Sequence, residues 1–407
     1  MNIHRLLFLL VVLFTSVVQA QTKSFIPEGS WRGVFDQADG TKVPFNFEVE
    51  GKSAAHAKIY LLNGGERFEG GRFRQAGDSL FISFDQFDNE FALKIENEKL
   101  TGVLRKKDQL GRSTPIEAIH GETYRFADSV EKPSGDISGK YEITFSGRNG
   151  VEEKKVGLFT QNGNKLSATF MSITGDSRYL EGLVQGNSFH LSSFIGGGIS
   201  YYTGTIDSVG LLRGTANGQP FKGNKNSNAA LPDAYQLTYL KEGYRTFDFS
   251  LPDAAGKQVS LKDEKFKNKV VIVTIGGTWC PNCIDEAAFV SPWYKKNKHR
   301  GVEVVGVQFE RKSDQEYVKT AMENFKKRFD IDYTEVFGGL ADKKAVAASF
   351  PALNSFLSFP TILFIDKRGN VDKIYTGFTG PATGEYYTRF IKEFNEEVDK
   401  LLGQPTG

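Results

Sequence analysis

Residues 270–283 read Val-Val-Ile-Val-Thr-Ile-Gly-Gly-Thr-Trp-Cys-Pro-Asn-Cys, and this stretch decides the fold of the C-terminal part of the chain. The apolar, mostly β-branched run at 270–275 predicts a buried strand, and the two glycines predict a tight turn after it. Cys280 then opens a helix. Pro281 suits the first helical turn, where the N–H group that proline lacks has no partner anyway.

Cys280 and Cys283 are the only two cysteines among the 407 residues. A bridge across two residues would constrain the unfolded chain very little, and a chain of this length buries an ample core without one. The pair is therefore interpreted as a redox centre. Because a helix N-terminus stabilises negative charge, Cys280 is the expected nucleophile. Cys283 lies on the same helix face and is placed to attack a mixed disulfide formed at Cys280.

Glu286 continues this helix face, three residues beyond Cys283. A carboxylate at that position can take the proton from Cys283 as the thiol becomes an attacking group. The catalytic residues predicted from the sequence are thus Cys280, Cys283 and Glu286. The alternative for Glu286 is a solvated helix acid, which is what we expect of Asp285.

Phe359-Pro360-Thr361 stands directly before an apolar run that predicts a strand at residues 361–365. A proline that opens a strand in a redox domain of this type suggests a cis bond facing the dithiol, where adjacent backbone pairs with a bound peptide. The residues expected to bind substrate are Trp279, Pro281, Phe359, Pro360 and Thr361.

The chain divides into regions with different patterns. Residues 246–407 alternate strand and helix patterns, which predicts an α/β domain. Strands are expected at 270–275, 302–309, 361–365 and near 374, and helices from 280, at 314–329, 341–349 and 386–402. Before this domain, residues 226–245 have the composition of a linker.

Residues 21–135 and 136–225 predict two β-rich modules, because short alternating segments are separated by Asn-Gly and Asp-Gly turns. Gly29-Ser-Trp31 resembles Gly139-Lys-Tyr141, and other short matches recur at about the same spacing. These matches favour either a duplication or a chance likeness between Gly-rich hairpins. The sequence does not decide between barrels and sandwiches.

The N-terminal residues 1–20 have the layout of a secretory signal peptide, with a cleavage site after Ala20. The apolar core is too short to span a bilayer, which takes about 20 residues. An uncleaved anchor is the alternative. We therefore expect an exported, periplasmic protein in a compartment where disulfides persist.

Composition excludes several classes of function. The chain has 51 basic and 49 acidic residues without a basic stripe, so nothing indicates nucleic acid as a partner. The five histidines lack the spacing of metal ligands, and there is no second cysteine pair, so no metal site is expected. No cofactor is expected beyond the redox-active Cys280–Cys283 disulfide.

Taken together, the Thr-Trp-Cys-Pro-Asn-Cys turn, Glu286 and Phe-Pro-Thr361 resemble the thioredoxin superfamily, and within it the exported TlpA/ResA-like thiol–disulfide oxidoreductases. The resemblance covers about residues 245–403. It implies a thioredoxin fold, Cys280 as exposed nucleophile, Cys283 as resolving thiol and Pro360 as the cis-proline. The N-terminal region resembles the extra module of members from Bacteroidetes-type bacteria. Thr274 stands where thioredoxins carry a buried Asp, which makes Glu286 the better proton acceptor.

The expected function is reduction of disulfides in other exported proteins, and the resemblance implies a membrane thiol-electron donor. Three alternatives remain. A periplasmic thiol oxidant or isomerase would use the same atoms at a higher potential. A thiol peroxidase would want a Pro-x-x-x-Thr-x-x-Cys turn, whereas Val273 and Gly277 occupy its Pro and Thr positions. The third is a β-domain binding module with an inactive thioredoxin-like tail. The substrate, the donor and the oligomeric state are not determined by the sequence.

Overall fold

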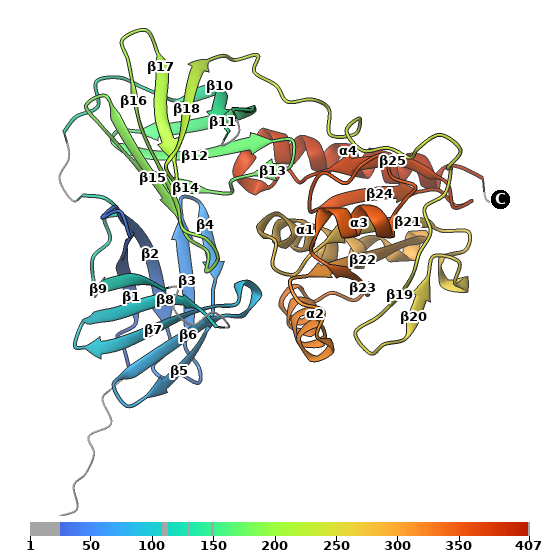
Figure 1. Ribbon diagram of the computed structural model, residues 1–407, viewed down its shortest axis with the longest axis horizontal. Helices are drawn as coiled ribbons and strands as arrows, with labels where there is room; N and C mark the ends of the chain where they lie inside the picture. Colours follow the sequence, from blue (N-terminus) through green and yellow to red (C-terminus); the bar gives the residue numbers. More distant parts are fainter. Residues whose placement is uncertain (1–24, 108–112, 128–130, 148–149, 406–407) are drawn as a thin grey trace, which may run out of the picture.

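The computed structural model describes residues 25–107, 113–127, 131–147 and 150–405, and it contains two β modules followed by an α/β domain (Figure 1). The predicted signal peptide, residues 1–20, lies outside the described residues. Within the described ranges, no helix has the length and apolar character needed to cross a membrane.

Module 1 is one antiparallel sheet that has nine strands in its described residues, in the order β4-β3-β2-β1-β9-β8-β7-β6-β5. Alternate residues of β1 are buried, including Trp31 and Phe35, because successive side chains of a strand point to opposite faces. The strands are β1 (Gly29–Asp36), β2 (Lys42–Glu50), β3 (Lys58–Asn63), β4 (Glu66–Glu69), β5 (Arg72–Ala76), β6 (Ser79–Phe84), β7 (Asn89–Glu96), β8 (Lys99–Lys106) and β9 (Ser113–His120).

Module 2 is a closed barrel. Its sheet runs β11-β10-β18-β17-β16-β15-β14-β12-β13, and β11 also pairs with β12, which closes the ring. Its strands are β10 (Gly139–Ser146), β11 (Glu152–Asn162), β12 (Lys165–Ser172), β13 (Gly175–Asp176), β14 (Leu180–Gln185), β15 (Ser188–Ser193), β16 (Ser200–Ile206), β17 (Leu211–Ala216) and β18 (Gln219–Lys225).

The strand order favours a duplication. In the described parts of both modules nine strands follow one another along the chain, and the first strand pairs with the second and with the last. The modules differ in the pairing between their third and fifth strands. In module 2 the fifth strand, β14, pairs with the third strand, β12, whereas module 1 has no such ladder among its described residues.

The C-terminal domain has a mixed sheet in the order β23-β22-β21-β24-β25, in which the first three strands are parallel. The α/β fold predicted from the sequence is confirmed. Its sheet and helices are β21 (Val270–Gly276), α1 (Pro281–Asn297), β22 (Val302–Glu310), α2 (Gln315–Phe329), β23 (Thr334–Leu340), α3 (Lys343–Ser349), β24 (Thr361–Ile365), β25 (Val371–Thr376) and α4 (Glu385–Leu402). A small hairpin, β19 (Ser250–Pro252) and β20 (Gln258–Ser260), precedes them.

Strand β21 lies at the centre of this domain and is buried along its whole length. Val270 and Ile272 face the core formed with α1, α2 and α4, whereas Val271 and Val273 face the core that includes residues from α3. Helices therefore cover both faces of the sheet, and the carboxyl end of β21 is left at its edge, where the dithiol turn begins.

The predicted linker, residues 226–245, contacts the C-terminal domain at residues that include Tyr235 and Leu240. The ring of Tyr235 packs edge-on against Tyr375, with ring centroids 4.9 Å apart. Leu240 forms a β-bridge with Leu353. These contacts connect module 2 to the C-terminal domain along one side of the molecule (Figure 1).

Candidate active site

Cys280 occupies the N-cap of helix α1, immediately after the turn that follows β21. Its Sγ accepts a hydrogen bond from the backbone N–H of Cys283, with the two atoms 3.3 Å apart. Both thiols are free. This is the arrangement by which a helix N-terminus stabilises a thiolate, so the geometry favours Cys280 as the attacking sulfur.

Glu310, the last residue of β22, fixes the turn before the dithiol. Its carboxylate accepts hydrogen bonds from the backbone N–H and the hydroxyl of Thr278, at 3.1 and 3.0 Å. Burial raises the pKa of Glu310 to about 7, against the lowering effect of these two hydrogen bonds. Next to Thr278, the indole N–H of Trp279 donates to the Phe309 carbonyl at 2.9 Å. The end of β22 therefore holds both residues that precede Cys280.

The Phe359–Pro360 bond is cis, which confirms the conformation predicted from the sequence. The Phe359 carbonyl oxygen lies 3.6 Å from the Cys280 Sγ. Thr361 is fully buried, and its hydroxyl donates to the Ser358 carbonyl at 2.8 Å. Its side chain thus supports the loop from within, while the Phe359 backbone faces the dithiol.

Cys283 and Glu286 are both buried, with 2% and 4% of their surface exposed. Burial raises the pKa of the Cys283 thiol well above its ordinary value, and the neighbouring Cys280 and Glu286 add to the shift. Burial likewise raises the pKa of Glu286, and none of the described residues hydrogen-bonds its Oε1. Thr274, also buried, cannot titrate in this range. Of these three buried side chains, only those of Cys283 and Glu286 titrate.

Comparison with known proteins identifies the family to which this domain belongs. The AhpC/TSA family matches residues 243–374. The thiol-disulfide oxidoreductase ResA of Bacillus cereus (strain ZK) is 31% identical over 154 residues, which cover 38% of this chain and 79% of the relative. The chain belongs to the ResA-like thiol-disulfide oxidoreductases. ResA of Bacillus subtilis (strain 168) is 29% identical over 153 residues, covering 38% of this chain and 77% of that protein.

Solved structures match a similar share of this ResA-like protein. A putative thiol:disulfide interchange protein DsbE from Chlorobium tepidum is 24% identical and covers 40% of this chain and 100% of its own, with a TM-score of 0.32. A thiol-disulfide oxidoreductase from Bacteroides fragilis is 22% identical and covers 37% of this chain and 99% of its own, with a TM-score of 0.28.

The expectation that Cys280 is exposed is wrong for this ResA-like chain, because only 5% of its surface is accessible. Its sulfur is enclosed by the Phe359 carbonyl and the first turn of α1, and module 2 packs against the loops around it. Residues 173–178, here called the cover segment, include β13 and reach the loops around the dithiol (Figure 1). The Ser358 hydroxyl donates to the Thr174 carbonyl at 2.8 Å, one residue before the cis bond. The backbone N–H of Gly380 donates to the Asp176 carboxylate at 2.7 Å.

Asp285 is not the solvated acid expected from the sequence. Arg178 of the cover segment forms an ion pair with Asp285 at 2.6 Å, and its side chain also pairs with Glu66 of module 1. The same guanidinium donates to the Pro281 carbonyl at 2.8 Å. Burial raises the pKa of Asp285 to about 7 because it outweighs the attraction of Arg178. All three parts of the chain thus meet at Arg178, beside the dithiol.

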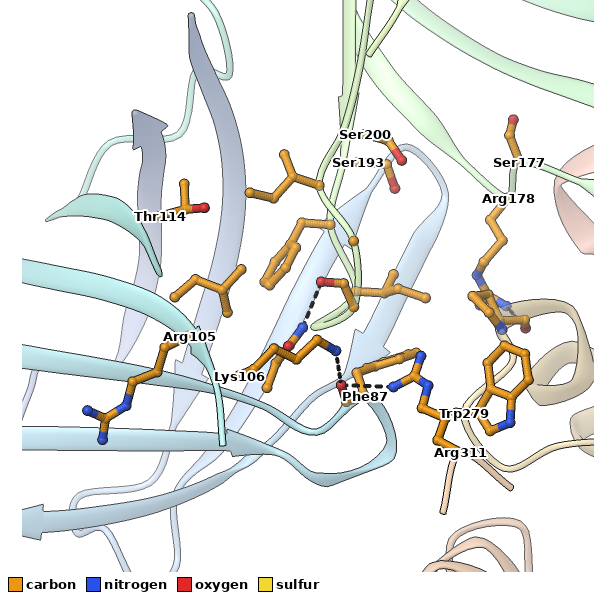
Figure 2. A pocket seen from close by; sticks show the side chains of 18 of the residues that line it. Phe87, Arg105, Lys106, Thr114, Ser177, Arg178, Ser193, Ser200, Trp279 and Arg311 are labelled. Atoms are coloured by element: carbon orange, nitrogen blue, oxygen red, sulfur yellow. Dashed lines mark hydrogen bonds between the residues drawn. The ribbon is translucent and has the colours of Figure 1, made fainter. Parts of the chain in front are cut away.

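A cleft of about 770 Å³ lies between the modules and the dithiol turn. Figure 2 shows Trp279 and Arg178 at one side of this cleft and Arg105 and Thr114 at the other. Arg311 crosses toward module 1, where it donates to the Phe87 carbonyl at 3.0 Å, and its guanidinium also lies over the Trp279 ring, 5.0 Å from the centroid.

The structure brings the predicted substrate-binding residues together around Cys280, although their exposure differs. Trp279 packs edge-on against Phe359, with ring centroids 5.7 Å apart, and Pro281 is exposed apart from its bond to Arg178. Sequence reasoning missed Glu310 and Arg178. Glu310 left a weak signal, since a charged residue directly follows the predicted strand at 302–309. Arg178 left none, because its partners are distant in the sequence.

Proposed function

We propose that this thiol-disulfide oxidoreductase is exported to the periplasm and reduces disulfide bonds of other exported proteins. The observation that carries the proposal is the buried Glu286 beside the buried Cys283. A base at this place serves the step in which Cys283 attacks, and by that step a reductase releases its product.

In the first step, the Cys280 thiolate attacks one sulfur of the client disulfide. A mixed disulfide between Cys280 and the client forms, the client S–S bond breaks, and the client's second sulfur leaves as a thiolate. The backbone N–H of Cys283, which bonds the Cys280 sulfur at 3.3 Å, stabilises the attacking charge before this step.

In the second step, Cys283 gives its proton to Glu286 and attacks the Cys280 sulfur. The Cys280–Cys283 disulfide forms, the mixed disulfide between Cys280 and the client breaks, and the client leaves with both sulfurs reduced after proton uptake. Two electrons pass from the dithiol to the client. Because the pKa of Glu286 is raised, its carboxylate is a stronger base than an exposed one. The oxidised dithiol then needs a donor, for which we propose a membrane thiol carrier.

The signal-like layout of residues 1–20 supports export. N-terminal sequencing of protein from the periplasmic fraction is expected to begin at Gln21. Retention in the cytoplasm with an intact Met1 would rule out the export proposal.

The reductase proposal is tested with the reduced protein and a peptide that contains one internal disulfide. The wild type is expected to release reduced peptide and to end with Cys280 joined to Cys283. The Cys283→Ser variant is expected to stop at the mixed disulfide, which intact mass reveals. If the wild type instead oxidised a reduced peptide under matched conditions, the alternative of a thiol oxidant would be favoured.

A further inference from the structure

The cover segment contacts three structures that surround Cys280. Arg178 reaches Pro281 within the Cys-x-x-Cys motif, Thr174 meets Ser358 in the cis-proline loop, and Asp176 meets Gly380 after β25. A polypeptide that presents a disulfide to Cys280 must approach through the space between these same structures. In this structure, the cover segment occupies part of that space, beside the cleft of about 770 Å³ that Trp279 and Pro281 line.

Glycine makes the close approach possible. Gly175 has φ +127°, which side-chain-bearing residues rarely adopt, and a Cβ there would overlap the side-chain amide of Asn282. On the opposing loop, a Cβ on Gly377 would lie 2.9 Å from the carbonyl carbon of Thr174. Gly175 of module 2 thus lies close to Asn282 in the Cys-x-x-Cys motif, and Thr174 lies close to Gly377 after β25. Neither contact leaves room for a larger residue at the glycine.

The cover segment is held by polar contacts rather than by a packed core. None of residues 173–178 belongs to the hydrophobic clusters formed by the described residues, and Ile173 is 37% exposed. Asp176 lines both the cleft of about 770 Å³ and a second cavity of about 540 Å³. Segments with few apolar contacts and empty space beside them are those that open locally at low cost.

Arg178 is the main fastening of the segment. It is a single buried guanidinium shared by Glu66, Asp285 and the Pro281 carbonyl, and its backbone adopts the left-handed region at φ 56°. Non-glycine residues hold that conformation only where surrounding contacts fix it. Loss of the ion pairs would therefore remove the contacts of the segment with Glu66 and Asp285, and leave the hydrogen bonds of Thr174 and Asp176 to hold it.

We propose that the cover segment is a displaceable lid over the client-binding groove, fastened by the Arg178 ion pairs. Without a client, the cover segment lies over the groove. A client polypeptide reaches Cys280 only when it displaces residues 173–178. This selects clients with a disulfide in a flexible stretch that can enter beside Trp279. The inference requires that Cys280 exchanges disulfides, and it holds for either direction of electron flow.

The test is the rate at which Cys280 of the full-length reduced protein reacts with a bulky maleimide–polyethylene glycol and with the small reagent iodoacetamide. Peptide mass mapping locates the modified cysteine. Arg178→Ala and Asp285→Ala are each expected to raise the rate with the bulky reagent by about tenfold, equivalent to about 1.4 kcal/mol lost from the closed state. The rate with iodoacetamide is expected to change less.

Two comparisons keep the test decisive. The double variant is expected to react no faster than Arg178→Ala alone, because the ion pair that Asp285→Ala removes is already lost in Arg178→Ala. Arg213→Ala, at an exposed position on β17 of the same module, is the matched control and is expected to react like the wild type. Asp285→Ala covers the case in which Arg178→Ala fails to fold.

The lid is ruled out if wild-type Cys280 reacts with the bulky reagent as fast as in both folded variants. This readout does not depend on the reduction potential, so failure of the lid and failure of the reductase proposal are separate results.

Discussion

Glu310 accepts two hydrogen bonds from Thr278, one from its backbone N–H and one from its hydroxyl, and so connects the end of β22 to the turn that presents Cys280. All three groups are buried. A buried donor without an acceptor costs about 1–3 kcal/mol, which makes this pair a support for the position of the nucleophile.

Replacing Glu310 by Ala is expected to lower the free energy of unfolding by about 1–3 kcal/mol and to slow disulfide exchange, because both Thr278 donors lose their acceptor. Glu310→Gln keeps an oxygen that accepts from the N–H, and its amide NH2 can donate to the Thr278 hydroxyl oxygen, so it is expected to recover most of both losses. Urea unfolding and peptide reduction measure the two effects. An Ala variant as stable and active as the wild type would contradict this role.

Replacing Glu286 by Gln is expected to slow the release of client from the mixed disulfide by about a hundredfold, in the range for loss of a general base. Formation of the mixed disulfide is expected to change less, since Cys280 attacks without help from Glu286. Acid-quenched samples analysed by intact mass separate the two steps. Glu323→Gln, on the exposed side of α2, is the control. Equal release rates in both variants would exclude Glu286 as the base.

Cys283 is expected to resist alkylation at neutral pH. Burial raises the pKa of its thiol well above the ordinary value of 9.0, so the reactive thiolate is scarce. In the Cys280→Ser variant, iodoacetamide should modify Cys283 slowly, with a rate that still rises above pH 9. An alkylation rate that reached a plateau below pH 8 would show that the pKa of the Cys283 thiol is not raised.

Stability is expected to fall as pH rises through about 7, in part because of Glu335. Burial raises the pKa of this carboxyl from 4.5 to about 7, against the lowering effect of the hydrogen bond from Gln308. The folded state thus holds the proton more tightly than the unfolded state. The protonated carboxyl therefore contributes its full stabilisation of the folded state below pH 4.5. This contribution, up to about 3 kcal/mol, is lost as the pH rises from 4.5 through about 7.

The Glu335→Gln variant isolates this contribution because it cannot titrate. Urea unfolding at pH 5 and pH 8 is expected to show a smaller loss of stability in the variant than in the wild type. Identical losses of stability would mean that the pKa of the Glu335 carboxyl is not raised in the folded protein.

The sequence predicted the C-terminal fold and the dithiol well because their signals are local. The buried strand, the turn and the two cysteines are neighbours in the sequence, and Pro360 directly precedes its strand. The sequence does not indicate strand β23, because Thr334–Leu340 has no continuous apolar run, ends in two glycines and a leucine, and lies at the sheet edge.

What the sequence did not reveal depends on contacts between distant parts of the chain. Arg178 and Asp285 are 107 positions apart (285 − 178) and lie in different domains, so neither the covering of Cys280 nor the burial of Asp285 has a local pattern. The short Gly-rich matches also leave the duplication of the modules open, because they carry little information. The shared strand order provides what those matches lacked.

The most direct test of the reductase proposal is the equilibrium reduction potential of Cys280–Cys283 in the mature protein, measured by alkylation and intact mass across a dithiothreitol series. We predict a two-electron transition near or below the potential of thioredoxin, about −270 mV. A potential near about −120 mV would make the protein an oxidant and would contradict the account.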